Sequence, residues 1–512
     1  MRRSMRHTAA RLVVVLAAAT TTAASLVALS TPASAYEVIW PGTAGSLTVS
    51  GHGYGHGHGL SQYGARGAAL KGVTAAQILS FYYPGTTATT QASAQVRVQI
   101  TANVGRPVIV SSRAGLLARD VVTGATRPLS TTYSHWRIGY SPTYGYVLQY
   151  LNAGRWNSLQ TSSHQMGFAG PSTNRLWFAP TATVNFAGVR SSAYREELRA
   201  VANGSSMITV NAVTMDLYLR SVVPRESPAS WPAAALQAQS VAARSYSSYQ
   251  RLAHARNLFD VYDTTRDQVY GGYATYSTAA AGGVVQEQAT TNAAIAATAN
   301  QIRTYAGKPI FAQFSSSNGG FSATGSQPYL RAAADPWEIY SGNPYQNWTA
   351  TAAVSSLRSL AGLRTLNRIY VNRQLTTGGH VTTVSFIGLN SSNQEVTVIK
   401  SGATLRSYFG WRSDYFGFVV TGSTDGGPSG SWPLVGDQIF AAAGSARVIN
   451  GVSAAQVKYR PYIMVIQREA AVGQTGIYDS ATVNGIYRWQ RLVGLPANGI
   501  VDSRTWQVMT VR

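Results

Sequence analysis

The 512-residue chain contains no cysteine and only 19 aspartate and glutamate residues. Without cysteine, disulfide bonds and thiolate metal sites are excluded, and stability must come from the burial of apolar side chains. The 41 lysine and arginine residues give a formal net charge of +22. This charge favours anionic partners: nucleic acid, anionic lipid, or a cell wall that carries teichoic acids and peptide carboxylates. Because 37 of the 41 are arginine, genomic base composition is an alternative source of part of the charge.

Long apolar runs are missing as well, apart from one near the N-terminus. Four arginines among the first 11 residues precede the apolar run Leu12–Ala18, and Ala33–Ala35 has the small residues of a cleavage site. The run is short and broken by threonines, so residues 1–35 are typical of a secretory signal peptide, with an uncleaved anchor as the alternative. We expect a secreted protein with no stable membrane insertion after cleavage. Export, and the lack of lysine and arginine runs with interleaved aromatics, argue against nucleic acid as the partner.

A Gly/Ser/Pro-rich stretch divides the chain near its C-terminal end. Residues 423–431 have the composition of a flexible linker, which separates a large body, residues 36–422, from a small module, residues 432–512. In the module, Gly476–Thr482 recurs as Gly499–Thr505, 23 residues later, and each copy places an aspartate where it can cap a new helix. With a further helix expected before the first copy, at 456–468, the module is predicted to be a three-helix bundle.

The body has the patterns of an α+β fold. Val96–Ile100 and Met207–Val210 alternate as half-buried strands do, and residues 110–200 are expected to form strands and loops. Long helices are expected only at Trp231–Ala253 and Thr74–Tyr82. The predicted body is therefore strand-rich with one long central helix, and it lacks the regular alternation of a doubly wound sheet.

One acidic residue stands out because acids are scarce. Glu226 lies between Pro224 and Pro228, on a predicted turn that joins the strand-like apolar segment Tyr218–Val223 to the long helix. This region resembles the active-site region of the SpoIID/LytB family, bacterial cell-wall proteins that include lytic transglycosylases and amidase enhancers. The resemblance implies that Glu226 is the catalytic residue.

The long helix carries two further candidates. Ala234–Tyr246 is similar to the family's stretch E-A-L-K-A-Q-A-V-A-A-R-T-Y-A, which implies that Gln239 and Arg244 contact substrate. The helical spacing places Gln239 on a stripe that forms either core or cleft wall. Arg244 would hold a sugar or lactyl carboxylate, or pair with a buried acid.

Two loops extend the resemblance. Ser316, Ser317 and Asn318 match the family's S-x-S-x-G-G element and would hydrogen-bond glycan, although such a loop alone is also typical of a solvated turn. Gly51–Ala65 matches G-x-G-x-G-H-G-x-G-M-S-Q-W/Y-G-A, which makes His56, Ser61 and Gln62 candidates for substrate binding. Its glycines permit the close backbone approach that a polymer groove requires. In many relatives this element closes the domain, whereas here it comes first, which predicts a circular permutation.

Metal binding is the rival interpretation of the glycine-rich segment. His52, His56 and His58 could bind Zn²⁺ or Ni²⁺, but the glycines fix no coordination geometry and no carboxylate is near in sequence. Some relatives carry zinc through Cys and His in a D-V-C-D-x-T-H-C-Q-V-Y element. The corresponding positions in Asp260–Tyr270 hold Tyr262, Arg266 and Asp267, so no structural zinc and no other metal or cofactor is expected.

The C-terminal module resembles the peptidoglycan-binding domain of many wall hydrolases, through its G-x-x-D-x-x-T and Q-x-x-x-G-L-x-x-x-G-x-x-D elements; a generic capped bundle is the alternative. Together the resemblances predict a wall-associated protein that acts on peptidoglycan glycan strands. The leading hypothesis is a lytic transglycosylase with Glu226 as its single general acid and base, with Asp216 and Asp263 as conceivable helpers. The alternatives are a glycan-binding enhancer of an N-acetylmuramoyl-L-alanine amidase and a purely adhesive wall protein.

Overall fold

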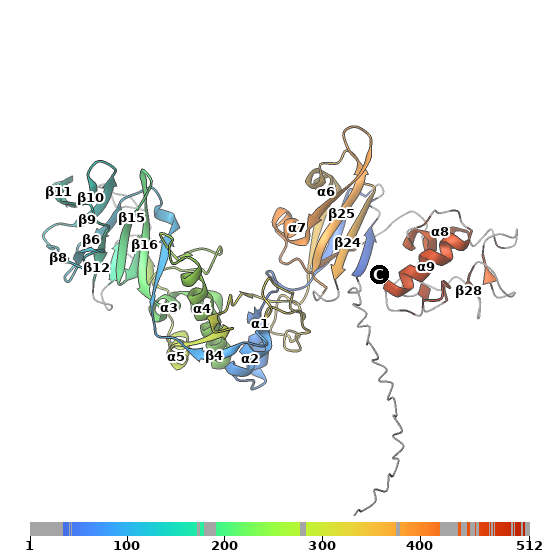
Figure 1. The fold of residues 1–512 in the computed structure, drawn as a ribbon, viewed down its shortest axis with the longest axis horizontal. Coiled ribbons are helices and arrows are strands. Elements are labelled where there is room, and N and C mark those ends of the chain that lie inside the picture. Colours follow the sequence, from blue (N-terminus) through green and yellow to red (C-terminus); the bar gives the residue numbers. More distant parts are fainter. Residues whose placement is uncertain are drawn as a thin grey trace, which may run out of the picture.

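The computed structural model describes residues 34–39, 41, 44–170, 175–178, 191–276, 283–374 and 379–419, and shorter stretches between 439 and 506. In this part of the chain, nine α-helices and several sheets form the α+β fold that the sequence predicts (Figure 1). Residues 1–33 of the predicted signal peptide and the predicted linker 423–431 lie outside the described residues. No helix within the described ranges is long and apolar enough to cross a membrane.

Two sheets form the first strand-rich lobe. One has the strand order β17 (Val261–Tyr262), β5 (Gln95–Ile100), β16 (Ser206–Thr214), β15 (Glu197–Asn203), β12 (Met166–Ala169), β7 (Leu117–Asp120), β8 (Thr126–Pro128). The other has the order β11 (Arg155–Ser162), β10 (Gly145–Asn152), β9 (His135–Ser141), β6 (Val108–Ser111), β13 (Arg175–Phe178), β14 (Ser191–Arg195), β18 (Ala274–Tyr276), β19 (Val284–Val285). Both contribute to one apolar core, in which Val98 and Phe168 of the first sheet join Val110 and Trp136 of the second. The predicted strands near 96–100 and 207–210 are confirmed, as is the strand-and-loop character of the described residues between 110 and 200.

A group of helices lies between this lobe and a second strand-rich lobe, which contains β24 (Arg368–Gln374) and β25 (Val381–Leu389) and is described below (Figure 1). It comprises α1 (Gln62–Leu70), α2 (Ala75–Tyr82), α3 (Met215–Glu226), α4 (Ala233–Ala253) and α5 (Ala289–Ala297). The long helix α4 contacts the other four, because its many alanines let neighbouring helices approach closely. The predicted helices at 231–253 and 74–82 are confirmed, and Thr74 caps α2 in a capping box.

Short pieces of chain connect these helices. The three-stranded sheet β21 (Lys308–Pro309), β20 (Gln301–Tyr305), β4 (Thr87–Thr90) lies against α4, and η1 (Thr101–Asn103) follows β5. The parallel pair β3 (Leu60–Ser61) and β22 (Phe314–Ser315) joins segments about 250 positions apart in the sequence. This pairing places the start of α1 beside the hydroxyl-rich loop that follows β22.

The interpretation of Tyr218–Val223 as a strand is wrong, because these residues lie in α3. Tyr218, Leu219, Val222 and Val223 are all fully buried. Along the chain these four residues are one, three and one positions apart, a pattern that fits one side of a helix as well as a short apolar strand. The sequence pattern alone therefore does not distinguish a helix from a strand here. Glu226 is consequently the last residue of a helix and not part of a separate turn.

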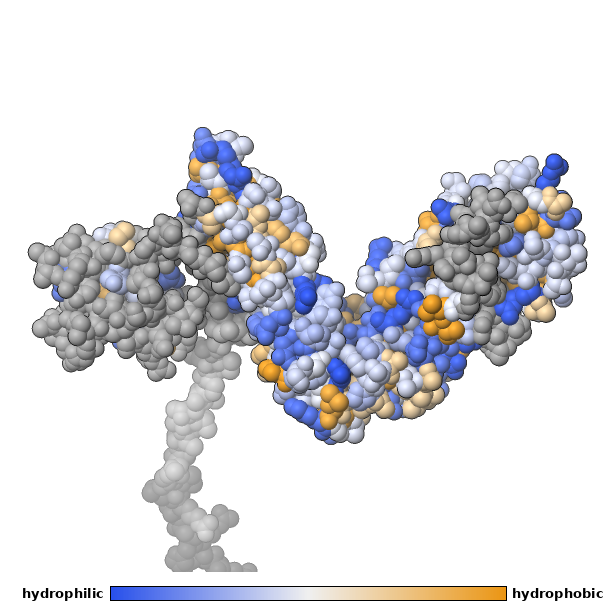
Figure 2. Space-filling model, turned by 180° about the vertical axis from the view of Figure 1, so that it is seen from behind, coloured by the Kyte–Doolittle hydropathy of each residue, from blue (hydrophilic) through white to orange (hydrophobic). Residues whose placement is uncertain are grey.

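The second lobe combines the start of the described chain with residues 348–419. Its larger sheet has the order β1 (Ser34–Ile39), β24 (Arg368–Gln374), β25 (Val381–Leu389), β26 (Glu395–Ser401); the smaller has β23 (Trp348–Ala353), β2 (Ser46–Gly51), β27 (Phe416–Val419). Helices α6 (Val354–Ala361) and α7 (Gly402–Phe409) accompany them. Figure 2 shows a hollow between the two lobes, with the helical part as its floor.

The C-terminal module contains β28 (Ile439–Phe440), β29 (Val448–Ile449), α8 (Arg460–Glu469) and α9 (Ser480–Leu492). The predicted caps are present: Asp479 accepts the Thr482 amide at 2.8 Å and Asp502 accepts the Thr505 amide at 2.7 Å. Residues 505 and 506 are helical, and the rest of the third predicted helix lies outside the described residues, so the three-helix bundle stays a prediction.

The internal repeat extends further than the sequence motif indicates. Gln467 donates to the Ile477 carbonyl at 2.8 Å, and Gln490, 23 positions later, donates to the Ile500 carbonyl at 2.7 Å. Both glutamines are buried. Each repeat therefore uses one buried amide to hold the loop that leads to its capping aspartate.

Candidate active site

Glu226 lies at the C-terminal end of α3 and is partly buried. Its Oε1 accepts a hydrogen bond from the Val269 amide, and its Oε2 accepts one from Nε2 of Gln62, both at 3.3 Å. Gln62 is the first residue of α1, so the carboxyl group is held where α1, α3 and the loop after β17 meet. Sequence positions 62, 226 and 269 are thereby brought to one point.

Burial raises the pKa of the Glu226 carboxyl, while the hydrogen bonds from Val269 and Gln62 lower it by less. The end of α3 acts in the same direction as burial, because a helix C-terminus carries partial negative charge. The neighbouring Arg225 donates to Gln286 at 2.5 Å. The surroundings of Glu226 therefore favour a protonated carboxyl group.

Gln239 of α4 is buried, and neither its Nε2 nor its Oε1 has a hydrogen-bond partner in the described part of the chain. Three positions before it, Leu236 belongs to an apolar cluster with Tyr63 of α1; four positions after it, Ala243 belongs to the core that contains Tyr218 of α3. Gln239 thus lies on the strip of α4 between its contacts with α1 and α3. Leaving a buried amide unpaired costs about 1–3 kcal/mol, so Gln239 has hydrogen-bonding capacity that the described chain does not use.

The two resembling loops meet through β3 and β22. Ser61 caps α1 by accepting the Gly64 amide at 3.2 Å, and the Tyr63 amide donates to the Ser316 carbonyl at 2.9 Å. Ser316 is partly exposed, whereas Ser61 and Ser317 are buried. The motifs therefore do lie side by side, but two of their hydroxyl groups face inward.

Those inward hydroxyl groups bind an acid that the sequence interpretation missed. Glu338 accepts hydrogen bonds from the Ser61 hydroxyl, from the Ser317 hydroxyl at 2.9 Å and from the Asn318 amide at 2.9 Å. Burial, followed by the nearby Asp335 carboxylate, raises the pKa of Glu338 to about 7. The only sequence signal was the scarcity of acids.

Asp335 continues this buried network. Its Oδ2 accepts from Nδ2 of Asn318 at 2.9 Å and from the Tyr82 hydroxyl at 2.6 Å. Both acids lie below 3% exposure. Ser61, Ser317 and Asn318, predicted to bind substrate, thus hold the loop together around two buried carboxyl groups.

A cavity of about 220 Å³ adjoins this network. Its walls are His52, Gly319, Glu338, Ile339, Gln346, Asn347 and Tyr415. It lies where the glycine-rich segment, the loop after β22 and the start of β27 come together. The cavity is separate from the hydrogen bonds that hold Glu226.

His56 lies toward the second lobe. Burial, and then the neighbouring His58, lower the pKa of His56 to about 3. Its Nδ1 accepts the His58 amide at 3.0 Å and the two rings stack at 4.9 Å, whereas His52 contacts the Gln346 carbonyl at 2.8 Å. Among the described residues, no group of three or more histidine or acidic side chains is placed to hold a metal ion.

Two glycines of this segment lie very close to other parts of the protein's own chain. A Cβ at Gly57 would lie 2.5 Å from the His380 ring, and one at Gly59 would lie 2.1 Å from the Gln313 carbonyl. Both have positive φ, +70° and +66°. They allow close approach to the protein's own chain, and the role of the glycine-rich segment in a polymer groove stays a prediction.

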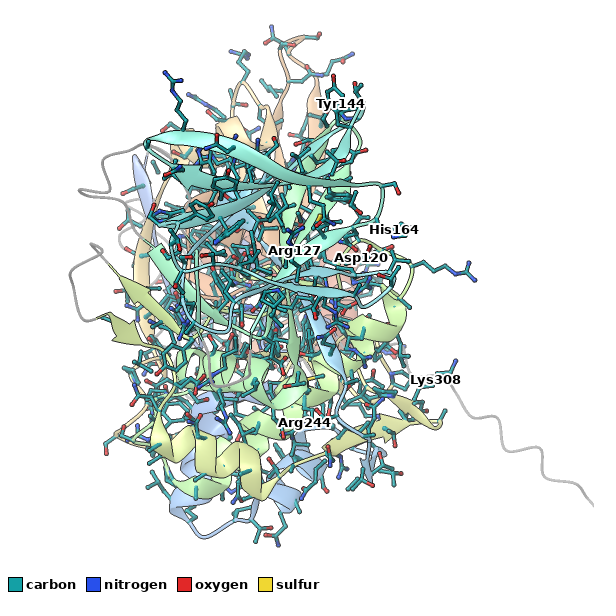
Figure 3. All side chains as sticks on the ribbon, turned by 90° about the vertical axis from the view of Figure 1, so that its left-hand side faces the viewer. Asp120, Arg127, Tyr144, His164, Arg244 and Lys308 are labelled. Carbon is teal, nitrogen blue, oxygen red and sulfur yellow. The ribbon has the colours of Figure 1, made fainter. Side chains whose placement is uncertain are left out.

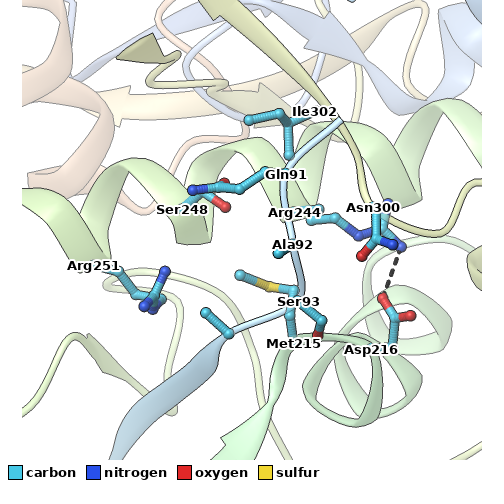
Figure 4. A pocket seen from close by; sticks show the side chains of 11 residues that line it. Gln91, Ala92, Ser93, Met215, Asp216, Arg244, Ser248, Arg251, Asn300 and Ile302 are labelled. Carbon is cyan, nitrogen blue, oxygen red and sulfur yellow. Dashed lines mark hydrogen bonds and ion pairs between the residues drawn. The ribbon is translucent and has the colours of Figure 1, made fainter. Parts of the chain in front are cut away.

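Arg244 pairs with an acid, Asp216, but this acid is 34% exposed and is not the buried acid that the sequence interpretation offered as an alternative. Arg244 is buried in α4, and its Nη2 lies 3.1 Å from Asp216 while its Nη1 donates to the Thr298 carbonyl at 2.8 Å. Figure 3 shows Arg244 within the helical part, and Figure 4 shows its ion pair with Asp216. The pocket there measures about 10 Å³, the space of one water molecule and too small for a sugar ring.

The two conceivable helper acids, Asp216 and Asp263, and the loop Asp260–Tyr270 form hydrogen bonds within the protein. Asp263 accepts the Thr101 hydroxyl at 2.7 Å. In the loop where some relatives carry zinc, Asp267 accepts the Tyr262 amide at 2.8 Å and the Tyr246 hydroxyl at 2.7 Å, and Arg266 stacks on the Tyr262 ring. Hydrogen bonds and a cation–π contact hold this loop against α4.

The fold and site define a class of protein: a strand-rich α+β body in which a partly buried acid at a helix C-terminus, Glu226, has a raised pKa, followed by a small capped helical module. Comparison with known families agrees. Residues 203–305 match the family of stage II sporulation proteins, SpoIID, and residues 467–509 match a peptidoglycan binding domain. The chain therefore contains a SpoIID family domain and a C-terminal peptidoglycan-binding domain. The match at 203–305 does not reach the glycine-rich segment, so the permuted order stays a prediction.

Three curated relatives are similar to parts of the chain. An amidase enhancer of Bacillus subtilis is 37% identical over 145 residues, which are 27% of this chain and 17% of that protein. An uncharacterized protein of Brachyspira hyodysenteriae is 42% identical over 80 residues, 15% of this chain and 22% of that protein. A stage II sporulation protein D of Bacillus amyloliquefaciens is 28% identical over 231 residues, 43% of this chain. The chain spans between 17% and 65% of the length of these relatives.

Proposed function

We propose that this protein is a secreted, wall-associated lytic transglycosylase that cleaves the glycan strands of peptidoglycan, with Glu226 as general acid and base. The observation that supports this most directly is the setting of Glu226: partly buried, at a helix C-terminus, with a raised pKa and two hydrogen-bond donors that fix both carboxyl oxygens. The SpoIID family match includes this residue. The peptidoglycan-binding domain supplies the substrate class.

One carboxyl group is sufficient for this reaction, whereas ordinary glycosidases use two. The protonated Glu226 gives its proton to the glycosidic oxygen as the bond to C1 of the muramic acid breaks. The carboxylate then takes the proton of the C6 hydroxyl of the same sugar as that oxygen attacks C1. The product ends in a 1,6-anhydro sugar, no water is consumed, and the acid is regenerated. Gln62 and the Val269 amide keep the carboxyl group in place for both proton transfers.

The test is Glu226→Gln, which keeps the size of the side chain and removes its proton. Purified protein is incubated with sacculi, and soluble products are identified by mass spectrometry. We expect 1,6-anhydromuropeptides from the wild type and at least a hundredfold less from the variant, since general acid–base catalysis contributes roughly 10²–10⁴-fold. Glu395→Gln, at a surface acid that is 54% exposed, is the matched control and should release wild-type amounts. Unchanged product formation by Glu226→Gln would remove this residue from the mechanism.

A second candidate is a non-catalytic enhancer of an N-acetylmuramoyl-L-alanine amidase. The similarity to the amidase enhancer of Bacillus subtilis favours this candidate. The comparisons support the enhancer and the transglycosylase equally. Here the wild-type protein alone would bind sacculi without releasing anhydro sugars. Adding it to a purified amidase would increase the release of stem peptides, and Glu226→Gln would stimulate as well as the wild type.

A further inference from the structure

A row of aromatic side chains begins beside the residues that hold Glu226. Tyr63 directly follows Gln62, and its ring lies 5.0 Å from that of Trp231 and 5.3 Å from that of Tyr345. The Tyr345 ring in turn lies 4.9 Å from that of Tyr54. The row thus brings together residues from α1, the turn just before α4, the glycine-rich segment and the loop before β23.

The outer members of the row are accessible and chemically unpaired. Tyr54 is 44% exposed, and Tyr63 and Tyr345 are partly exposed. None of these three hydroxyl groups has a hydrogen-bond partner within the described ranges. In contrast, the buried Tyr82 and Tyr83 donate to Asp335 and to a backbone carbonyl at 2.6 and 2.8 Å. The row therefore presents aromatic ring surface to a ligand, and it also presents hydroxyl groups that have no partner among the described residues.

Two arginines flank the row. The guanidinium of Arg66 lies 5.5 Å from the Trp231 ring and 5.8 Å from the Tyr340 ring, and that of Arg412 lies 5.6 Å from the Tyr345 ring. Arg412 is exposed and forms no ion pair with any described acid. A stacked, unpaired guanidinium is suited to a carboxylate on a ligand that also contacts the aromatic ring.

We propose that Tyr63, Tyr345 and Tyr54, with Arg412, form a track for successive sugar rings of a carboxylate-bearing glycan strand that leads away from Glu226. This proposal rests on the proposed function, because it takes its occupant from the glycan substrate. Pyranose rings have apolar C–H faces that pack on aromatic rings, while their hydroxyl groups need polar partners. Such a strand carries free lactyl carboxylates where stem peptides are absent and peptide carboxylates where they are present, and either matches the positive charge of Arg412. Sugars nearest the acid would lie at Tyr63, and more distant ones at Tyr345 and Tyr54.

The test measures strand binding in a full-length protein that carries Glu226→Gln, so that binding is observed without cleavage. Soluble glycan fragments of increasing length are titrated by calorimetry. Tyr345→Ala and Tyr54→Ala are compared with Tyr144→Ala, a tyrosine that is 70% exposed on the first lobe (Figure 3). All variants keep the C-terminal module, so differences among them arise in the body.

We expect Tyr345→Ala and Tyr54→Ala to weaken binding of long fragments roughly threefold to tenfold, with the effect of Tyr54→Ala lost for disaccharides. Arg412→Gln should weaken binding of peptide-free fragments, whose lactyl carboxylates are charged. It should leave binding of chitin oligomers, which lack lactyl groups, unchanged. Tyr144→Ala should match the parent. If Tyr345→Ala and Tyr54→Ala equal Tyr144→Ala at every length, the track is refuted.

The two proposals fail in different ways. Wild-type protein that releases no anhydro sugars, together with length-dependent loss of binding in the track variants, would refute the transglycosylase and keep the track. Normal cleavage with an unchanged KM in Tyr345→Ala and Tyr54→Ala would keep the enzyme and refute the track. An equal effect of Arg412→Gln on lactylated and plain oligomers would refute the role of its charge.

Discussion

At the scale of single residues, the pKa of the Glu226 carboxyl group depends on the hydrogen bond that Gln62 donates to it. The proposed reaction requires the protonated carboxyl group, so the rate should fall as pH rises through the pKa of Glu226. The Gln62 amide lowers that pKa by stabilising the carboxylate. Gln62→Met removes the donor at similar volume, so the alkaline limb of the pH–rate profile should move to higher pH.

The measurement is kcat against pH for the wild type, Gln62→Met and Gln394→Met. Gln394 is exposed in the second lobe and serves as the control for the chemistry of the substitution. A limb that moves to lower pH, or one that moves equally in both variants, would contradict the role assigned to Gln62.

Glu338 makes a separate prediction about stability. Its pKa is raised from 4.5 to about 7 in the folded protein, so the folded state binds this proton more tightly than the unfolded state. Its contribution to stability is present in full below about pH 4.5 and is lost as pH rises through about 7. The loss amounts to about 3 kcal/mol.

Thermal unfolding of the wild type and Glu338→Gln between pH 4 and 8 measures this effect, because glutamine does not titrate. The wild type should lose stability relative to the variant as pH rises across this interval. Parallel pH profiles would show that the buried carboxyl group keeps the same protonation state in the folded and unfolded chains.

At the scale of elements, the glycine-rich segment is fixed by its contacts. Gly59 combines a positive φ with a neighbouring carbonyl 2.1 Å from the position of an added Cβ, whereas Gly72 has φ +81° and open space around it. Gly72→Ala should therefore cost about 1 kcal/mol from the backbone conformation alone. Gly59→Ala should cost about 1–3 kcal/mol more, because the chain must also move apart.

Denaturant unfolding of both variants gives the comparison. Equal losses would mean that Gly59 is required only for its backbone angle and that the contact with Gln313 is easily displaced.

At the scale of the whole molecule, the C-terminal module is expected to raise the local concentration of wall around the body. Deletion of residues 432–512 should weaken pulldown by sacculi more than it slows cleavage of soluble glycan oligomers. The remaining binding should weaken with added salt, since a strongly basic chain meets an anionic wall and exposed charges are screened. Equal losses in the two assays would exclude a tether role.

How far the sequence predicts the structure differs between elements. The long helix, the helix near 74–82, the alternating strand near 96–100 and the aspartate caps of the module are all local patterns, and the structure contains them. The segment before Glu226 is misassigned from the sequence because its four apolar and aromatic positions fit both periods. The second lobe could not be predicted, because it joins strands more than 300 positions apart.

The sequence by itself determined the α+β class and the C-terminal module, because these depend on local spacing, and it singled out Glu226 as a candidate because acids are rare in this chain. Tertiary structure alone decided what surrounds Glu226, which serines face inward to Glu338, and that Arg244 pairs with Asp216. The physical reason is that burial and charge pairing are set by segments brought together in space. A carboxyl group's pKa depends on those neighbours and not on its own position in the chain.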